Sequence, residues 1–227
     1  MEFESFTTTA RWQILERLAE REKSASEIAE ETGASLANIS QQLKLLEAHG
    51  LVKRVNTEHV EGEKRGAGKP RQAFALAKEV AFLALVKRGL AAKRTLKLDP
   101  HQKVILAIWA LEKDHAYLER LYWQQEGLVA ESVAIAVVDS TPEEIHLLVV
   151  APEERLDKLR KAYSKIIIKP ADGNEKRVIS WTHSFEELRE GLSRGEEYFK
   201  KLLTKPAIIV DREDLLRTFL DEVKGKR

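Results

Sequence analysis

The N-terminal part of the chain carries apolar side chains at helical spacing, in short segments separated by small polar residues. Thr8 or Thr9 can cap a first helix, and Ser24-x-x-Glu27 has the form of a capping box that begins a second one. Gly33 is expected to end this second helix. The residues expected to face inward are Trp12, Ile14, Leu15 and Leu18 in the first helix, and Ile28 and Ala29 in the second.

A third helix is predicted to begin at Ser35 and to stop at Gly50, and a β-hairpin follows it. The two strands are 51–55 and 72–76, and the loop between them includes the glycine-containing segment 61–71. This order of helices, turn and hairpin predicts a winged helix-turn-helix. The apolar stripe expected to anchor the third helix is Leu36, Ile39, Leu43 and Leu46.

The segment 77–97 is predicted to be a basic helix, or a helix plus a connection. Asp99-Pro100 then provides an N-cap and a first helical position for a helix from Pro100 to about Gln125, which Gly127 would close. We place the domain boundary near residue 98. The prediction is a winged helix-turn-helix domain with its basic wing and following helix at 1–97, and a linker helix with an α/β domain at 98–227.

The second half alternates predicted strands and helices, which indicates a mixed α/β domain and, for the whole chain, an α+β fold. The expected strands are 132–138, 145–150, 166–168, 178–181 and 206–210. The expected helices are 152–165, one that starts at the capping box Ser184-x-x-Glu187 and extends to Leu202, and a closing helix from Asp211 or Asp214.

Composition narrows the class of protein. Of the 227 residues, 43% are hydrophobic, which is enough for packed cores. No apolar run reaches about 18 residues, and the N-terminal residues include acids without an apolar stretch, so we expect no membrane span, no signal peptide and a cytoplasmic location. Cysteine is absent, which excludes disulfides and thiolate metal sites. Lys, Arg and Glu dominate the 33% of charged residues, a balance that suits a thermophile.

Charge is distributed unevenly, although the net charge is only +1. Residues 1–63 hold seven bases and twelve acids, whereas residues 64–97 hold ten bases and the single acid Glu79. Because electrostatic fields fall off over roughly 10 Å in salt, a local basic strip suffices for phosphate contact. A solvated, ion-rich surface is the other interpretation of the same pattern.

The predicted third helix presents amides and small polar residues opposite its apolar stripe. Asn and Gln can bind adenine through two hydrogen bonds, and each such pair discriminates between bases by about 1–3 kcal/mol. Four phosphate contacts from the wing would give a log–log salt slope of about −4. The candidate DNA-binding residues are Ser35, Asn38, Ser40, Gln41, Gln42 and Lys44 in the helix, and Lys64, Arg65, Lys69 and Arg71 in the wing.

From about Thr8 to Lys78 the chain resembles the ArsR-like winged-helix regulators. The matching segments are RWQIL (11–15), SEIA (26–29), ISQQLKLL (39–46) and GLV (50–52). The resemblance implies a homodimer that binds a pseudo-palindromic operator in double-stranded DNA, usually as a repressor. The metal-sensing cysteines of the founding members have no counterpart in this sequence, so we do not expect metal sensing.

The C-terminal half is similar to nucleotidyltransferase-type domains in IHLLVV (145–150), FEEL (185–188) and AIIVD (207–211). Active members have a Gly-Ser turn followed by two aspartates, one residue apart, that hold Mg²⁺. Here the turn is Asp139-Ser140-Thr141-Pro142, and Glu144 and His146 occupy the aspartate positions. The resemblance therefore implies an inactive relative with a sensing or dimerising role. The favoured interpretation of Glu144 and His146 is that they are plain surface residues on a hairpin.

Two alternatives stay open: a winged helix that binds only proteins, and a nucleotidyltransferase guided by a nucleic-acid-binding module. We predict no catalytic residue, no metal site and no cofactor, and we name a small-molecule effector as a further candidate partner. The histidines lack metal-ligand spacing, and His101 is expected to be solvated. Four aromatic residues are expected in the core or in a dimer seam, with a ligand pocket as the alternative: Trp109, Tyr117, Tyr122 and Trp123.

Overall fold

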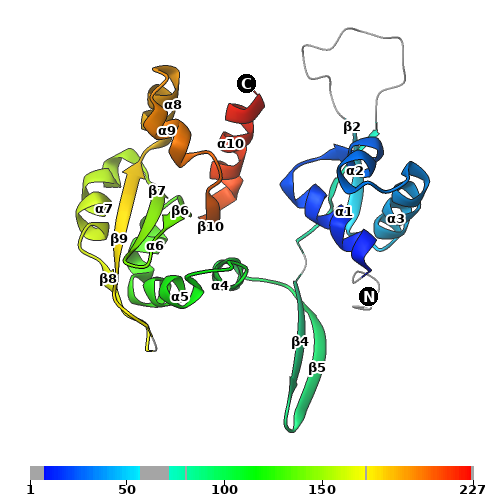
Figure 1. Ribbon diagram of the computed structural model, residues 1–227, viewed down its shortest axis with the longest axis horizontal. Coiled ribbons are helices and arrows are strands. Elements are labelled where there is room, and N and C mark those ends of the chain that lie inside the picture. The colour runs from blue at the N-terminus through cyan, green and yellow to red at the C-terminus, as the bar shows by residue number, and fades with distance from the viewer. Residues whose placement is uncertain (1–7, 57–71, 80, 172, 226–227) are drawn as a thin grey trace. The chain divides into compact units, whose positions relative to one another are not determined.

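The structure is a computed structural model that describes residues 8–56, 72–79, 81–171 and 173–225. The chain divides into two compact units, Met1–Leu98 and Asp99–Arg227 (Figure 1). Both helices and strands occur in each unit, so the chain has an α+β fold. We describe each unit by itself.

The first unit follows the predicted order of helices and wing strands. The Ser24 capping box is confirmed, since the Ser24 hydroxyl accepts from the Glu27 backbone N–H and the Glu27 carboxylate accepts from the Ser24 backbone N–H at 2.7 Å. Gly33 ends the second helix with φ 68°, a backbone conformation that favours glycine. The elements are α1 (Thr9–Glu20), β1 (Lys23–Ser24), α2 (Ala25–Thr32), α3 (Leu36–Ala48), β2 (Val52–Asn56), β3 (Gln72–Leu76), β4 (Ala81–Lys87) and β5 (Leu90–Leu96).

One hydrophobic core joins α1, α2, α3 and the strands of the first unit. Two expectations about it are wrong. Trp12 is 56% exposed, because it lies on the side of α1 that faces away from the core, and Leu36 is 51% exposed, at the first residue of α3. Thr8 precedes α1 but forms no side-chain cap. The buried residues of this core are Ile14, Leu18, Ile28, Ile39, Leu43, Leu46, Leu51, Val52 and Phe74.

A buried cation fastens α2 to α1. Lys23 is only 4% exposed, and its Nζ donates to Glu20 Oε2 at 3.0 Å and to Glu31 Oε1 at 2.7 Å. The hydrogen bond from Lys23 lowers the pKa of the Glu20 carboxyl. Because a buried charge is tolerated only when it is paired, this contact ties the last turn of α2 to the end of α1.

The wing strands form an antiparallel sheet in the order β1-β3-β2. In the β2–β3 ladder Val52 lies opposite Leu76 and Asn56 opposite Gln72, so the predicted hairpin strands are confirmed in the part of the chain that the structure covers. The predicted wing cations Lys64, Arg65, Lys69 and Arg71 lie outside the described residues.

The prediction of a basic helix over 77–97 is wrong. This segment forms the antiparallel hairpin β4–β5, with Ala81 opposite Leu96 and Lys87 opposite Leu90. Gly89, at φ 81°, makes the tight turn between the strands, a conformation that would interrupt any helix here. Alanine, leucine, lysine and arginine are good helix formers, so local propensity pointed the wrong way.

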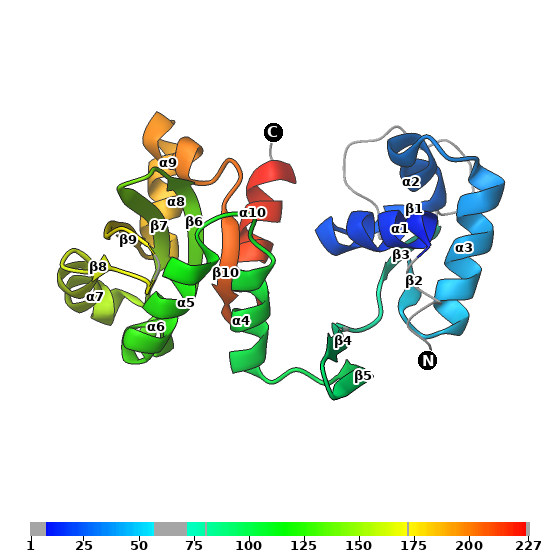
Figure 2. The same cartoon turned by 60° about the horizontal axis from the view of Figure 1, so that its bottom comes forward.

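The second unit is a mixed sheet between two layers of helices (Figures 1 and 2). Its strand order is β10-β6-β7-β9-β8, where β7 and β9 are parallel and the other neighbours are antiparallel. The strands are β6 (Ala134–Ser140), β7 (Glu144–Val150), β8 (Ile167–Ile168), β9 (Lys176–His183) and β10 (Ala207–Asp211). The helices are α4 (Pro100–Trp109), α5 (His115–Gln124), α6 (Glu126–Glu131), α7 (Leu156–Tyr163), α8 (Phe185–Ser193), α9 (Glu197–Leu202) and α10 (Leu215–Gly225).

The two faces of this sheet belong to different cores. Along β7, Leu147 and Val149 pack with α4, α5, α6 and α7, whereas Leu148 and Val150 pack with α8, α9 and α10. Successive side chains of a strand point to opposite faces, so a strand that is apolar throughout is suited to the middle of three layers. Figure 2 shows α4 alongside β10.

Two predicted long helices are each broken in the structure. The expected helix from Pro100 to Gln125 is interrupted at Asp114, which takes φ 61° and places its carboxylate 2.7 Å from the buried Lys176 Nζ. Gly127 lies inside α6 instead of closing a helix. The expected helix that extends to Leu202 breaks at Gly195, where φ is 74°. Asp99 does cap α4 with Pro100 in its first turn, as predicted.

Two helical glycines allow a matched test of packing in the second unit. A Cβ at Gly191 in α8 would collide with the ring of Phe199, whereas a Cβ at Gly127 in α6 meets nothing within 4 Å. We expect Gly191→Ala to lower the free energy of unfolding by about 1–3 kcal/mol through overpacking. Gly127→Ala should instead raise it by about 0.5–1 kcal/mol, because alanine favours the helix. Thermal and urea unfolding of both variants, followed by circular dichroism, measures the difference. Equal effects would contradict the packing around Gly191.

Candidate nucleic-acid interface

Helix α3 is anchored on one side and open to solvent on the other. Ile39, Leu43 and Leu46 are at most 1% exposed and repeat at spacings of four and three residues. The stripe displaced by two residues along the helix, Ala37, Gln41 and Lys44, is exposed. Because a displacement of two residues rotates a helical position by about 200°, burial of the first stripe directs the second away from the core.

The N-terminal end of α3 is held in place by its cap. The Ser35 hydroxyl accepts a hydrogen bond from the backbone N–H of Asn38 at 3.3 Å, and the turn 33–35 separates α3 from α2. Asn38 itself is exposed. The amino end of a helix carries free N–H groups and a partial positive charge, so this end suits an approaching phosphate.

One of the candidate base-reading residues is already engaged within the protein. Gln42 is half-buried, and its side-chain oxygen accepts from Arg11 Nε of α1 at 2.8 Å, while its Nε2 donates to Asn38 Oδ1 at 3.4 Å. This chain of contacts orients Gln42 and Asn38 along one flank of α3. Ser40 is half-buried on the opposite flank. The structure therefore brings Asn38, Gln41 and Lys44 to the open side, and leaves Ser40 and Gln42 at its margins.

Sequence reasoning missed apolar residues on the open side of α3. Leu45 is 37% exposed at the edge of the open side, and Leu36 is 51% exposed in the first turn of the helix. Apolar side chains in a DNA groove contact the methyl group of thymine. A helical wheel would have placed Leu45 about 120° from Ile39, outside the buried stripe, whereas it places Leu36 within that stripe. The exposure of Leu36 goes with its position at the first residue of α3.

An ion pair and a hydrogen bond lie at the C-terminal end of α3. Arg54 of β2 pairs with Glu47 at 2.8 Å and also donates to Gln72 at 3.3 Å, which ties the helix to the wing strands. Lys44 and Lys53 are exposed nearby. The described residues of the first unit thus add lysine charge around a face of amides and small side chains.

A three-residue turn between α2 and α3, an open third helix and a following antiparallel wing define a winged helix-turn-helix unit. Residues 8–54 match the sequence profile of the bacterial regulatory protein, arsR family. The match covers α1, α2, α3 and the start of β2, and it supports DNA binding and a role in transcription regulation. Among curated proteins, none matches the chain. In the part of the chain that the structure describes, no helix is long and apolar enough to cross a membrane.

The second unit places the Glu144–His146 pair on β7. His146 Nε2 lies 3.2 Å from Glu144 Oε2, and the ring of His146 lies 6.4 Å from that of Trp181. Within the described ranges, no group of three or more His, Asp or Glu side chains could hold a metal ion. The carboxylate that the nucleotidyltransferase resemblance would offer to Mg²⁺ is therefore paired with an imidazole.

The aromatic residues of α4 and α5 do not form one seam. Trp109 and Trp123 are more than half exposed, whereas Tyr122 is buried. The expectation that His101 is solvated is wrong: its Nδ1 lies 2.6 Å from the Tyr122 hydroxyl and its ring packs edge-on against Trp123. The contact joins the start of α4 to α5, and burial raises the pKa of Tyr122.

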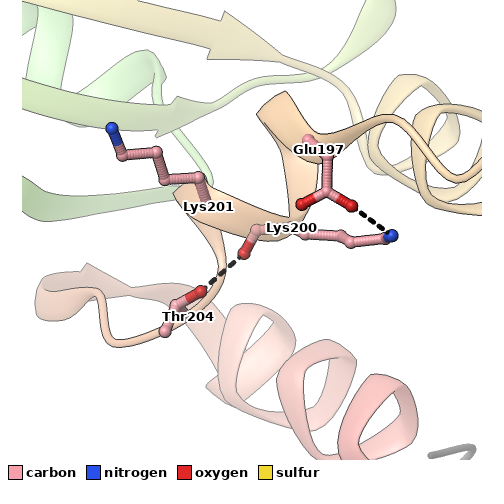
Figure 3. Close-up of a pocket in the computed structure, with 4 residues that line it drawn as sticks. All are labelled: Glu197, Lys200, Lys201 and Thr204. Carbon is pink, nitrogen blue, oxygen red and sulfur yellow. Dashed lines mark hydrogen bonds and ion pairs between the residues drawn. The ribbon is translucent and has the colours of Figure 1, made fainter.

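A shallow hollow lies beside α9 (Figure 3). Glu197 and Lys200 form an ion pair of 2.6 Å, the Thr204 hydroxyl donates to the Lys200 backbone carbonyl at 2.8 Å, and Lys201 extends away from this pair. None of these four side chains is buried. The hollow contains no desolvated polar group that could orient a ligand, so we assign no function to it.

A network of titratable groups joins α7, β9, α8 and α9. Arg160 pairs with Glu187 at 2.7 Å, Glu187 lies 3.0 Å from His183 Nδ1, and His183 Nε2 lies 2.9 Å from the Tyr198 hydroxyl. Burial lowers the pKa of His183 and outweighs the opposite effect of Glu187. Burial also raises the pKa of Tyr198 to about 12. A neutral His183 suits both contacts, because its Nδ1–H donates to the carboxylate and its Nε2 accepts from Tyr198.

This network predicts a pH dependence of stability. Because the pKa of His183 is lower in the folded than in the unfolded protein, the unfolded chain binds its proton first as the pH falls below about 6.5. The contribution of His183 to stability is fully present above that pH and is lost as the pH falls through the lower, folded-state pKa. We expect His183→Gln to weaken the dependence of unfolding free energy on pH in this acidic range, measured by urea unfolding. His115→Gln, at an exposed site on α5, should behave as the wild type. A wild-type pH profile in His183→Gln would refute the assignment.

Proposed function

We propose that the protein is a sequence-specific transcription regulator that binds double-stranded DNA as a homodimer and acts as a repressor. The observation that carries the proposal is the open side of α3, where Gln41, Lys44 and Asn38 stand exposed beside a small-residue surface. A recognition helix requires this combination, since bulky side chains would keep its backbone away from the base edges. The match of residues 8–54 to the arsR family supports the same function.

In this proposal each chain of the dimer places α3 in the major groove at one half-site. Two half-sites about 34–36 Å apart correspond to one turn of the duplex, so a two-fold symmetric protein binds a pseudo-palindromic operator. Gln41 reads a base edge, and Lys44 contacts a phosphate. Repression follows where such an operator overlaps a promoter, since the bound dimer then excludes polymerase.

The second unit has a sensing or dimerising role in this proposal, and the protein is not an enzyme. Support comes from Glu144, whose carboxylate contacts His146 at 3.2 Å. In active nucleotidyltransferase-type domains, which this half resembles in sequence, two aspartates hold Mg²⁺ at the corresponding positions. A nucleotide-incorporation assay with Mg²⁺ tests this part. Turnover that is lost in Glu144→Gln would overturn it.

Substitutions on α3 test the mode of DNA recognition. Genomic fragments that the protein retains would first be selected and sequenced to define the operator. Gln41→Ala should then cost about 1–3 kcal/mol of discrimination at one base pair of each half-site, because the bidentate contact is lost. Binding affinities for single-base operator variants, measured by fluorescence anisotropy, give this quantity. Gln124→Ala, at an exposed position of α5, is the matched control and should keep the wild-type preference.

Salt dependence separates phosphate contact from base contact. Lys44→Ala should reduce the magnitude of the log–log salt slope by about 1 for each subunit that contacts DNA and weaken all sequences alike. Lys161→Ala, at an exposed site of α7, removes the same charge and should leave the slope unchanged. Sedimentation of the complex should show two chains per operator. If neither α3 substitution altered binding, or if no fragment were selected, a protein-binding winged helix would replace the proposed function.

A further inference from the structure

The hairpin β4–β5 is a two-stranded ribbon without a third strand in the described part of the chain (Figure 1). A lone hairpin is marginally stable in water, because it buries little apolar surface. Its root is attached to the first unit, since Phe82 packs against the core of α1, α2 and α3. Most of its length has no such cover, and Val86, next to the turn, is 84% exposed.

The ribbon is cationic and contains no acid. From Ala81 to Leu98 the sequence has five lysines or arginines and no aspartate or glutamate. Lys87 and Arg88 lie at the tip, beside the turn residue Gly89, and both are exposed. The remaining cations are Lys93, Arg94 and Lys97.

The exposed hairpin could bind either a second copy of itself or a polyanion. The pairing register of β4 and β5 distinguishes these two partners. Leu83 lies opposite Arg94 and Lys87 opposite Leu90, so the face that carries the leucines also carries two cations. If this face packed on its own copy, the cations of both chains would be buried without an acid from either hairpin. Burying unpaired charge is costly, so the pattern favours a partner that brings negative charge.

The root of the hairpin starts close to the recognition helix. The backbone N–H of Ala77 donates to the Leu51 carbonyl at 2.8 Å, and a Cβ at Gly50, just after α3, would lie 4.0 Å from Lys78 Nζ. Only 77–80 separate β3 from β4. A strand of seven residues spans about 24 Å, which corresponds to roughly seven base pairs of duplex.

From these observations we infer that β4–β5 is a second DNA-binding element that follows the duplex beyond the base pairs read by α3. Lys87 and Arg88 contact phosphates, and Val86 lies in the minor groove. Ribbons and arms that bind the minor groove combine cations with exposed apolar side chains in this way, and the apolar side chain opens a base step and bends the duplex. The inference rests on the proposed function, because α3 must dock for the hairpin to reach flanking DNA.

Duplexes of two lengths test the inference. One contains the selected operator alone, and the other adds about ten base pairs on each side, one helical turn. The wild type should bind the longer duplex more tightly. A variant that combines Lys87→Ala with Arg88→Ala should lose this advantage and bind both duplexes as the wild type binds the short one. Two phosphate contacts from each of the two subunits also mean that wild-type affinity for the long duplex should fall about a hundredfold more than the variant's between 50 and 200 mM salt.

The matched control combines Lys161→Ala with Lys165→Ala, which removes two exposed cations from the second unit and should retain the preference for the long duplex. Val86→Ala should reduce the bend of the long duplex, measured by energy transfer between its labelled ends. An unchanged length preference in the tip variant would overturn the inference. A dimer that dissociates in that variant would also overturn it, and would assign the hairpin to contact between copies.

The same duplexes distinguish failure of the inference from failure of the proposed function. Selectivity for the operator over a scrambled duplex of equal length tests α3, whereas the effect of length at constant sequence tests β4–β5. If Gln41→Ala loses selectivity for the operator while the tip variant keeps the wild-type preference for the long duplex, the proposed regulator is retained and the hairpin contact is rejected.

Discussion

The arrangement of the first unit depends on the burial of one face of α3. Ile39, Leu43 and Leu46 are almost completely removed from solvent against α1, α2 and the wing strands, and burying each such side chain contributes about 1.5–3 kcal/mol. This packing fixes the orientation of α3 about its own axis. The exposure of Gln41 and Lys44 follows from that orientation, and so does the position of the wing, which Arg54 ties to the end of α3 through Glu47. In the proposed function, a residue far from DNA therefore influences recognition if it contributes to this apolar contact.

The second unit obeys a different constraint, since its central strand β7 must satisfy two apolar layers. Leu147 and Leu148 are adjacent in sequence and lie in separate cores, which explains the continuous apolar run that made this half resemble a nucleotidyltransferase-type domain. The resemblance rests on residues that build the sheet. At the start of β7, where active nucleotidyltransferase-type domains carry their aspartates, Glu144 contacts His146. The buried Lys176 is paired with Asp114. An apolar pattern along a strand thus indicates that both faces of the sheet are covered by helices, and it indicates little about activity.

Local signals in the sequence predicted the elements well where one residue type has one structural role. Ser24, Ser35 and Asp99 cap the helices that they were expected to begin, and Gly33 ends α2. Prediction from the sequence failed where tertiary contacts determine the local structure. The segment of β4 and β5 has helical propensity, yet the turn at Gly89 and the pairing of the two strands make it a hairpin. The break at Asp114 was missed because its partner, Lys176, lies on a strand distant in sequence. At the interface, composition identified the polar residues of α3. It could not show that Arg11 holds Gln42, because that contact joins two helices.

The excess of positive charge is concentrated in one segment of the chain. Acids outnumber bases both in residues 1–63 and in the second unit, while the segment 64–97 holds ten bases and one acid. A protein that was basic over its whole surface would bind any duplex, since counterion release is independent of sequence. In the proposed function, an excess of cations concentrated in residues 64–97 makes phosphate contact depend on how α3 docks, because the remainder of the chain has an excess of acids and repels other approaches within a Debye length. The base contacts proposed for Gln41 would then determine which site is occupied, even though they contribute less affinity than the phosphate contacts do.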